Sequence, residues 1–137
     1  MRQSVAEEKL AVCTLEIGKD ETSLADIGAV VAHLRARIEA HPKVRLIGVF
    51  DHYAHTRNVA SGTIAPEILA AQNILLCFGL TLPDPQSLAL RPRSIGVCEL
   101  ADRFVISFLE APMPVANSTI EQWTASVCDR PVALVED

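Results

Sequence analysis

Hydrophobic and polar residues follow two different rhythms along this chain. Residues 10–17 and 103–109 alternate with a period of two, which places successive side chains on opposite faces of a strand. Between residues 24 and 38 the apolar side chains recur every three or four positions, which lines one face of a helix. The chain therefore combines strands and helices.

Signals at both ends define the first predicted helix. Ser23 is suited to accept an amide proton of the first turn, and Asp26 adds negative charge where the helix dipole favours it. Pro42, which follows His41, ends the helix because proline cannot continue it. We therefore expect the helix to begin after Ser23 and to end at His41.

Three further apolar stretches, residues 44–50, 73–78 and 93–100, predict strands. The first of them is apolar on both faces, which favours a central position in the sheet. A short helical turn is expected over residues 66–71. Ala101-Asp102 separates the last two strands and suits an antiparallel hairpin.

A second main helix is expected over residues 118–128. It opens with Ser118-x-x-Glu121, in which each side chain can satisfy the other residue's amide. The predicted fold is α+β, with a mixed sheet of about five strands in β-α-β-β-β-β-α order and two main helices packed on one face. Residues 1–137 contain no repeat or linker, which indicates a single domain.

The composition and charge of the chain argue against two kinds of binding partner, nucleic acids and membranes. The 137 residues are half apolar and carry a formal net charge of −5 without a basic block, so binding to nucleic acid is not expected. No apolar run approaches the roughly 20 residues that a membrane-spanning helix requires. No signal peptide is recognisable, so we expect a cytoplasmic protein that does not bind membranes.

The four cysteines are scattered through apolar surroundings and form no Cys-x-x-Cys pair. Such a pattern is typical of reduced thiols that act as small hydrophobic side chains. We therefore expect neither a disulfide framework nor a thiolate zinc site at these positions, which are Cys13, Cys77, Cys98 and Cys128.

The polar run at residues 51–57 is the strongest candidate for chemistry. Asp51, His52 and His55 are three potential metal ligands within five residues, and the two imidazoles share one side only if the segment is helical. A divalent metal site would need further ligands on neighbouring strands. The candidates to complete it are Glu99, Cys98 and Glu110.

Two other interpretations of this run stay open. His52 or His55 would serve as a general acid or base, since imidazole titrates near neutral pH. Alternatively, Asp51 caps a reversal of the chain and the histidines bond nearby backbone groups, which we favour over a metal site.

A second candidate site is the segment Arg91-Pro92-Arg93-Ser94. Its proline keeps the backbone extended, so the side chains of Arg91 and Arg93 point to the same side of the chain. Paired arginines suit a carboxylate or phosphate group, and Arg57 or a histidine could contribute. The alternative is an internal salt bridge to Asp51, Asp84 or Glu110.

Four tracts of the chain resemble a family of short bacterial proteins that is known only as a domain of unknown function. The similarity covers roughly residues 40–125 and is carried by FDHYAHT at 50–56, CFG at 77–79, RPRSIGVCEL at 91–100 and VISFLEAP at 105–112. The order of elements is also similar to that of another uncharacterised bacterial superfamily, which implies a homodimer. Neither resemblance implies an activity or a cofactor.

Three hypotheses of function follow from these residues. The first is a small-anion-binding domain that uses Arg91, Arg93, Ser94, His52, His55 and Arg57. The second is an enzyme in which Asp51, His52 and His55 hold a divalent metal, or in which a histidine is the base. The third is a protein interaction module whose histidines are purely structural.

Overall fold

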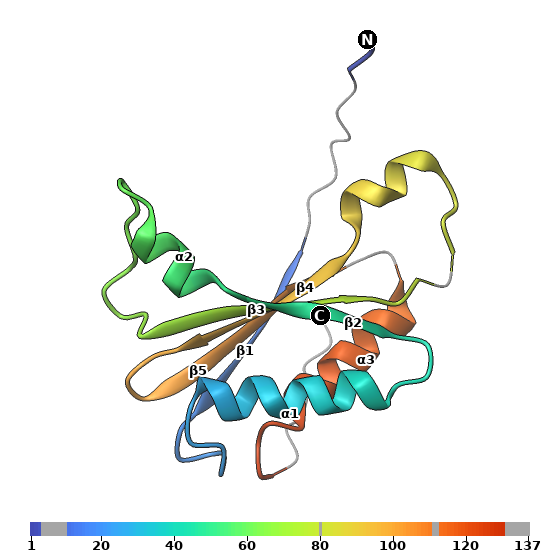
Figure 1. Cartoon of the computed structure of the whole chain (residues 1–137). Helices are drawn as coiled ribbons and strands as arrows, with labels where there is room; N and C mark the ends of the chain where they lie inside the picture. Colours follow the sequence, from blue (N-terminus) through green and yellow to red (C-terminus); the bar gives the residue numbers. More distant parts are fainter. Residues whose placement is uncertain (4–10, 80, 111–112, 131–137) are drawn as a thin grey trace.

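The computed structural model describes residues 1–3, 11–79, 81–110 and 113–130. Leu10, where the first predicted strand begins, lies outside these ranges. The described elements follow the order β-α-β-α-β-η-β-β-α (Figure 1). Their bounds are β1 Val12–Gly18, α1 Ile27–Ala40, β2 Arg45–Asp51, α2 His52–Asn58, β3 Ala70–Cys77, the 3₁₀ helix η1 Pro85–Leu90, β4 Arg93–Glu99, β5 Arg103–Leu109 and α3 Pro114–Ala125.

The five strands form one sheet in the order β1-β5-β4-β3-β2. The predicted α+β class is confirmed, but every neighbouring pair is antiparallel, so the sheet is not mixed. The strand predicted to be central, β2, lies at an edge. Its apolar character on both faces reflects exposed side chains such as Ile47 and Phe50, rather than neighbours on both sides.

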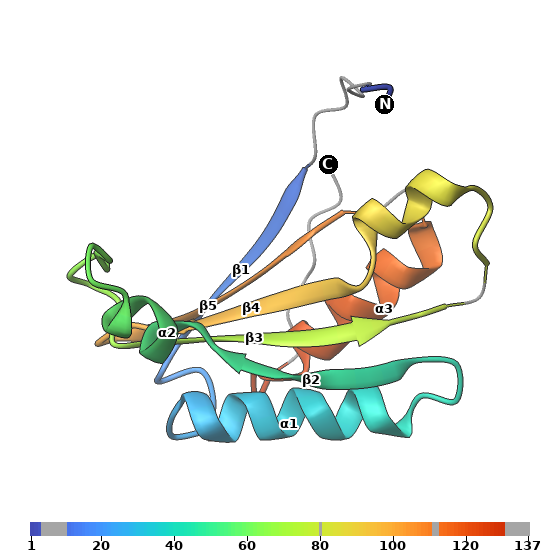
Figure 2. The same cartoon turned by 45° about the horizontal axis from the view of Figure 1, so that its top comes forward.

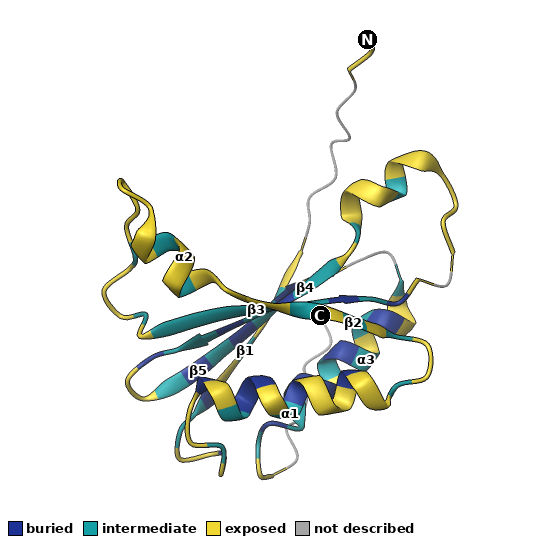
Figure 3. Cartoon of the chain, in the orientation of Figure 1, coloured by how far each residue is buried: buried dark blue, intermediate teal, exposed yellow. Residues whose placement is uncertain are grey.

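Helices α1 and α3 pack together on one face of the sheet, as predicted (Figure 1). Their buried sides face the strands (Figure 3). One hydrophobic cluster contains side chains from α1, from α3 and from the sheet. Fully buried members include Leu34 of α1, Phe104 of β5 and Ile120 of α3. Trp123 stacks on Phe78 with ring centroids 6.0 Å apart, which closes one end of this core.

Both main helices begin at residues other than those predicted. The N-cap of α1 is Asp26, whose carboxylate accepts from the amide of Ala29 at 2.8 Å, while Ser23 bonds Asp129 instead. Helix α3 begins at Pro114, and proline suits a first turn because its missing amide is not needed there. The Ser118-x-x-Glu121 motif consequently lies inside the helix.

The second face of the sheet, which we call the open face, lies opposite α1 and α3. Helix α2 and the loop that follows it lie at one end of this face, and η1 rises at the other end (Figures 1 and 2). Its side chains alternate with the buried ones along each strand. They include Val12, Thr14 and Glu16 of β1, Arg45 and Phe50 of β2, Ala71, Asn73, Leu75 and Cys77 of β3, Ser94, Gly96 and Cys98 of β4, and Arg103, Val105, Ser107 and Leu109 of β5.

Among the residues that the structure describes, no helix is both long and apolar enough to cross a membrane.

Candidate functional site

The polar run at residues 51–57 folds as helix α2 directly after β2. Asp51 is its N-cap, and its side chain accepts from the amide of Ala54 at 2.9 Å. The interpretation of Asp51 as a cap for a chain reversal is therefore confirmed. Because the segment is helical, His52 and His55 share one side, with ring centroids 6.3 Å apart and Phe50 at 5.4 Å from each.

A chain of hydrogen bonds leads from α2 across the open face. Asn73 donates to Ser94 Oγ at 3.0 Å, which leaves its Oδ1 facing His52 Nδ1, also at 3.0 Å. Since Oδ1 only accepts, Nδ1 of His52 donates this hydrogen bond, and Nε2 takes no part in it. His52 is thus oriented by another side chain and not by backbone groups.

The predicted metal ligands do not converge as a set of three. The carboxylate of Asp51 is used in capping α2, while His52 is held by Asn73. Within the described part of the chain, a different group brings three potential ligand atoms within 4.8 Å of one another. It consists of Cys13, Glu110 and Glu121.

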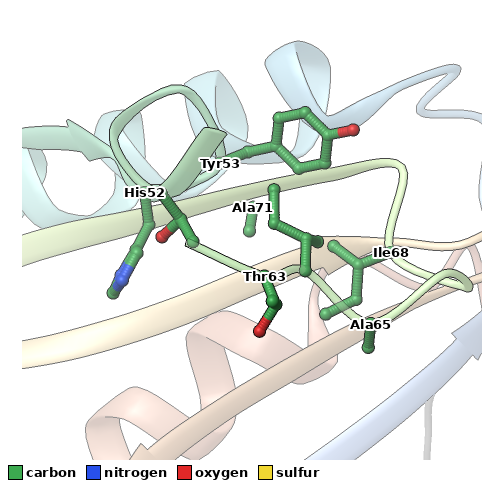
Figure 4. Close-up of a pocket in the computed structure, with 8 residues that line it drawn as sticks. His52, Tyr53, Thr63, Ala65, Ile68 and Ala71 are labelled. Carbon is green, nitrogen blue, oxygen red and sulfur yellow. The ribbon is translucent and has the colours of Figure 1, made fainter. Parts of the chain in front are cut away.

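A hollow of about 270 Å³ lies beside His52, beneath α2 and on the open face. Ala71 of β3 forms part of its floor, α2 forms one wall, and the loop between α2 and β3 forms another (Figure 4). Its lining is apolar apart from three hydroxyl groups and His52. The residues are His52, Tyr53, Thr56, Thr63, Ile64, Ala65, Ile68 and Ala71.

The predicted arginine pair lies elsewhere. Arg93 points to the helix-covered side of β4, where Nη2 donates to the carbonyl of Leu109 at 2.5 Å and to Asn117 Oδ1 at 3.0 Å. Arg91 donates to the carbonyl of Thr81 and lies 4.0 Å from the sulfur of Met113. Both guanidinium groups thus lie near the start of α3, Arg91 beside Met113 and Arg93 beside Asn117, whereas His52 and His55 lie on α2.

The expected internal salt bridges of these arginines are absent among the described residues, where Arg91 and Arg93 use backbone carbonyls instead. Burial lowers the pKa of Arg93. Arg57 lies exposed on α2, and Ser94 is linked to His52 through Asn73. Of the predicted anion-binding residues, only His52, His55 and Arg57 belong to α2.

The residues expected to complete a metal site have other roles. Glu99 faces α1, where its carboxylate accepts from the amide of Ile27 at 2.7 Å and pairs with Lys19 at 2.9 Å. Cys98 lies on the open face, and burial raises its pKa. All four cysteines are unpaired and partly buried, and none is a fully buried core residue.

No sequence pattern predicts the cluster that Cys13, Glu110 and Glu121 form. These residues come from β1, the end of β5 and α3, so no local motif announces them. The thiol of Cys13 donates to Glu110 at 3.3 Å. Burial raises the pKa of Cys13 to about 11, helped by this hydrogen bond and by the negative charges of Glu110 and Glu121. A protonated thiol is a poor metal ligand and a poor nucleophile.

We expect Cys13 to resist alkylation until the pH approaches about 11, whereas an ordinary thiol ionises near 9.0. Between these values the unfolded chain releases the proton first, so this thiol lowers the stability of the fold as the pH rises. A Glu110→Gln variant should react faster at mildly alkaline pH, because it lacks one negative charge beside the thiol. Peptide-resolved mass spectrometry after iodoacetamide treatment measures the rates.

The matched control for this experiment is Glu67→Gln, which removes an exposed carboxylate outside the cluster. It should leave the rate of Cys13 unchanged. Rapid alkylation of Cys13 at neutral pH in the unaltered chain would contradict the protonated thiol.

The residues around the hollow and the open face were also largely missed. Asn73 follows Gln72 and stands at the start of the strand predicted over residues 73–78, where a polar residue is not distinctive. Tyr53 and Thr56 were part of the singled-out polar run, but Thr63 lies in a loop with no distinguishing pattern.

Comparison with known proteins adds one match. A family model described as a family of unknown function (DUF6858) matches residues 1–129. A search of the curated proteins finds no match to the chain.

Proposed function

Because the chain belongs to a family of unknown function (DUF6858), membership supplies no activity, and we propose from the structure that it is a small-ligand-binding domain. Its site is the hollow beneath α2. The observation that carries this proposal is the lining of the hollow, where three hydroxyl-bearing residues, Tyr53, Thr56 and Thr63, lie among mostly apolar ones. Sites for small molecules generally combine apolar walls with a few polar groups that orient the ligand.

The lining also indicates the class of ligand. None of the residues around the hollow is a lysine, arginine, aspartate or glutamate. Burying a charged group without a partner is unfavourable, so a neutral molecule fits better than an ion. The volume of about 270 Å³ is close to the lower limit for ligand sites. We therefore expect a compact ligand with an apolar body and one or two hydrogen-bonding groups.

The anion-binding alternative draws on different residues. It would combine His52, His55 and Arg57 without Arg91 and Arg93, which face the start of α3. An anion at α2 would lack the paired guanidinium groups that make bidentate recognition strong. Binding of a neutral molecule in the hollow requires none of these arginines.

The enzymatic alternative depends on His52. Asn73 occupies Nδ1, so Nε2 is the ring nitrogen left for proton transfer. The hollow places hydroxyl groups nearby but no carboxylate among its lining residues. Ligand binding accounts for all of these groups, whereas catalysis would use only His52.

Filling the hollow should abolish ligand binding. Ala71→Leu adds apolar volume on the floor, so a compound that stabilises the unaltered chain should no longer do so. At a concentration of about 100 times Kd, such a compound stabilises the fold by roughly 2.7 kcal/mol. Thermal unfolding in the presence of a library of small neutral compounds, with phosphate, sulfate and acetate as further members, measures this effect.

The matched control is Ala36→Leu, which makes the same change at an exposed position of α1. It should keep the full stabilisation. Compounds that stabilise the Ala71→Leu variant as strongly as the unaltered chain would place binding elsewhere. Stabilisation by phosphate or sulfate that is lost in Arg57→Ala would favour the anion-binding alternative.

A further inference from the structure

The centre of the open face carries no charge. Strands β3, β4 and the part of β5 from Val105 onward contribute neutral side chains to it, and none is an aspartate, glutamate, lysine or arginine. They are Ala71, Asn73, Leu75, Ser94, Gly96, Cys98, Val105, Ser107 and Leu109. A sheet face that contacts only water usually carries polar side chains in alternation with the buried ones. This composition is unusual for a surface left in solvent.

Charged residues of the open face lie at its margins. Glu16 on the edge strand β1 pairs with Arg103 at 3.3 Å, at one corner of the sheet, and Arg45 lies at the start of the opposite edge strand β2. Protein interfaces show the same arrangement, in which charge is depleted at the centre and polar groups surround it.

Two polar side chains at the centre, Asn73 and Ser94, already have partners. Asn73 donates to Ser94 and accepts from His52, so these side chains can leave water without losing these hydrogen bonds. Gly96 beside them adds no side chain to the surface. Such a surface suits packing against another sheet.

Large apolar side chains of the open face remain exposed, both at its centre and around it. Phe50 of β2 is 41% exposed, and the paired residues Val12 and Leu109 are 62% and 47% exposed. The 3₁₀ helix η1 rises at one end of this face (Figure 1). Its residues Leu88 and Leu90 are also exposed. Covering these side chains would remove apolar surface from water and favour association.

We propose that a second copy of this chain covers the open face, so that two sheets pack face to face. Five strands about 4.8 Å apart and seven residues long present roughly 500 Å² of projected surface, and the exposed leucines of η1 extend it. Stable interfaces bury about 800 Å² on each partner, so the face with its flanks is large enough. A neutral centre requires no complementary charge, and an identical neutral face therefore fits it.

This dimer does not depend on a ligand in the hollow. Ala71 belongs to both surfaces, so the second copy would also cover the hollow from above and shield a bound molecule from water. Loss of compound binding with an intact dimer would overturn only the proposed function. A monomer that still binds compounds in the hollow would overturn only the dimer.

Sedimentation equilibrium at micromolar concentration tests the dimer. The unaltered chain should have twice the chain mass of 14.8 kDa. Ser107→Lys and Leu75→Lys each place a charge at the centre of the open face and should yield the mass of a single chain. Ala36→Lys, which adds the same charge on exposed α1, should leave the mass doubled.

The mass of the unaltered chain is decisive even if a variant fails to fold. A single-chain mass throughout the micromolar range would overturn the dimer. A doubled mass that persists in both folded lysine variants, as judged by circular dichroism, would place the interface elsewhere and would equally overturn it.

Discussion

Leu34→Ala is expected to lower the free energy of unfolding by about 3 kcal/mol, because it opens a cavity that the surrounding core cannot fill. Leu34 is 0% exposed and lies on the side of α1 that faces the sheet. In a chain of this size the loss corresponds to a fall in Tm of about 10 °C. Urea unfolding followed by circular dichroism measures the change.

Leu69→Ala is the matched control, since Leu69 is 52% exposed in the loop before β3. Its effect should stay within about 0.5 kcal/mol, as for most surface substitutions. Equal losses in the two variants would contradict the packing of α1 against the sheet.

Glu99→Ala is expected to lower the free energy of unfolding by about 2–3 kcal/mol, because two charge-assisted hydrogen bonds are lost and one backbone donor is left without its partner. The carboxylate of Glu99 binds the amide of Ile27 at the start of α1 and the ammonium group of Lys19. It therefore ties the end of β4 to the helix. Glu99→Gln keeps an acceptor for the amide of Ile27 and should cost about half as much.

The control for Glu99 is Glu16→Ala, which removes another ion-paired carboxylate. The side chain of Glu16 is 61% exposed, against 16% for Glu99, and exposed ion pairs contribute little. We expect a loss of less than about 1 kcal/mol in urea unfolding. A comparable loss in both variants would show that Glu99 does not anchor α1.

Local patterns in the sequence were sufficient to predict the α+β class, the helix α1 and the hairpin of β4 and β5. Each of these depends on contacts between residues near one another in the chain, which periodicity and turn residues report directly. The amide of Leu100 and the carbonyl of Arg103 close the hairpin at 2.8 Å, around the Ala101-Asp102 pair.

The order of the strands could not be read in the same way. The apolar character of β2 favoured a central strand, yet β2 is an edge whose side chains remain exposed. The predicted start of α1 was wrong for a related reason. Ser23 bonds Asp129, which is far away in sequence, and Asp26 caps α1 in its place. A cap motif indicates what a residue can bond, while the tertiary fold decides which bond forms.

The candidate site was predicted only in part. The polar run at residues 51–57 does border the hollow, because it forms α2, and Ser94 does connect to it through Asn73. The expected site that combines His52 with Arg91 and Arg93 does not form, because successive side chains of β4 point to opposite faces of the sheet. Arg93 points toward the helices, whereas its neighbour Ser94 points to the open face.

Chemical-shift mapping of the isotope-labelled chain with a stabilising neutral compound is the most direct test of the hollow as the binding site. The structure predicts that the largest perturbations of backbone amides fall on α2, on the loop residues Thr63 to Ile68 and on Ala71. Perturbations centred on Arg91, Arg93 and the start of α3, with α2 unaffected, would contradict it.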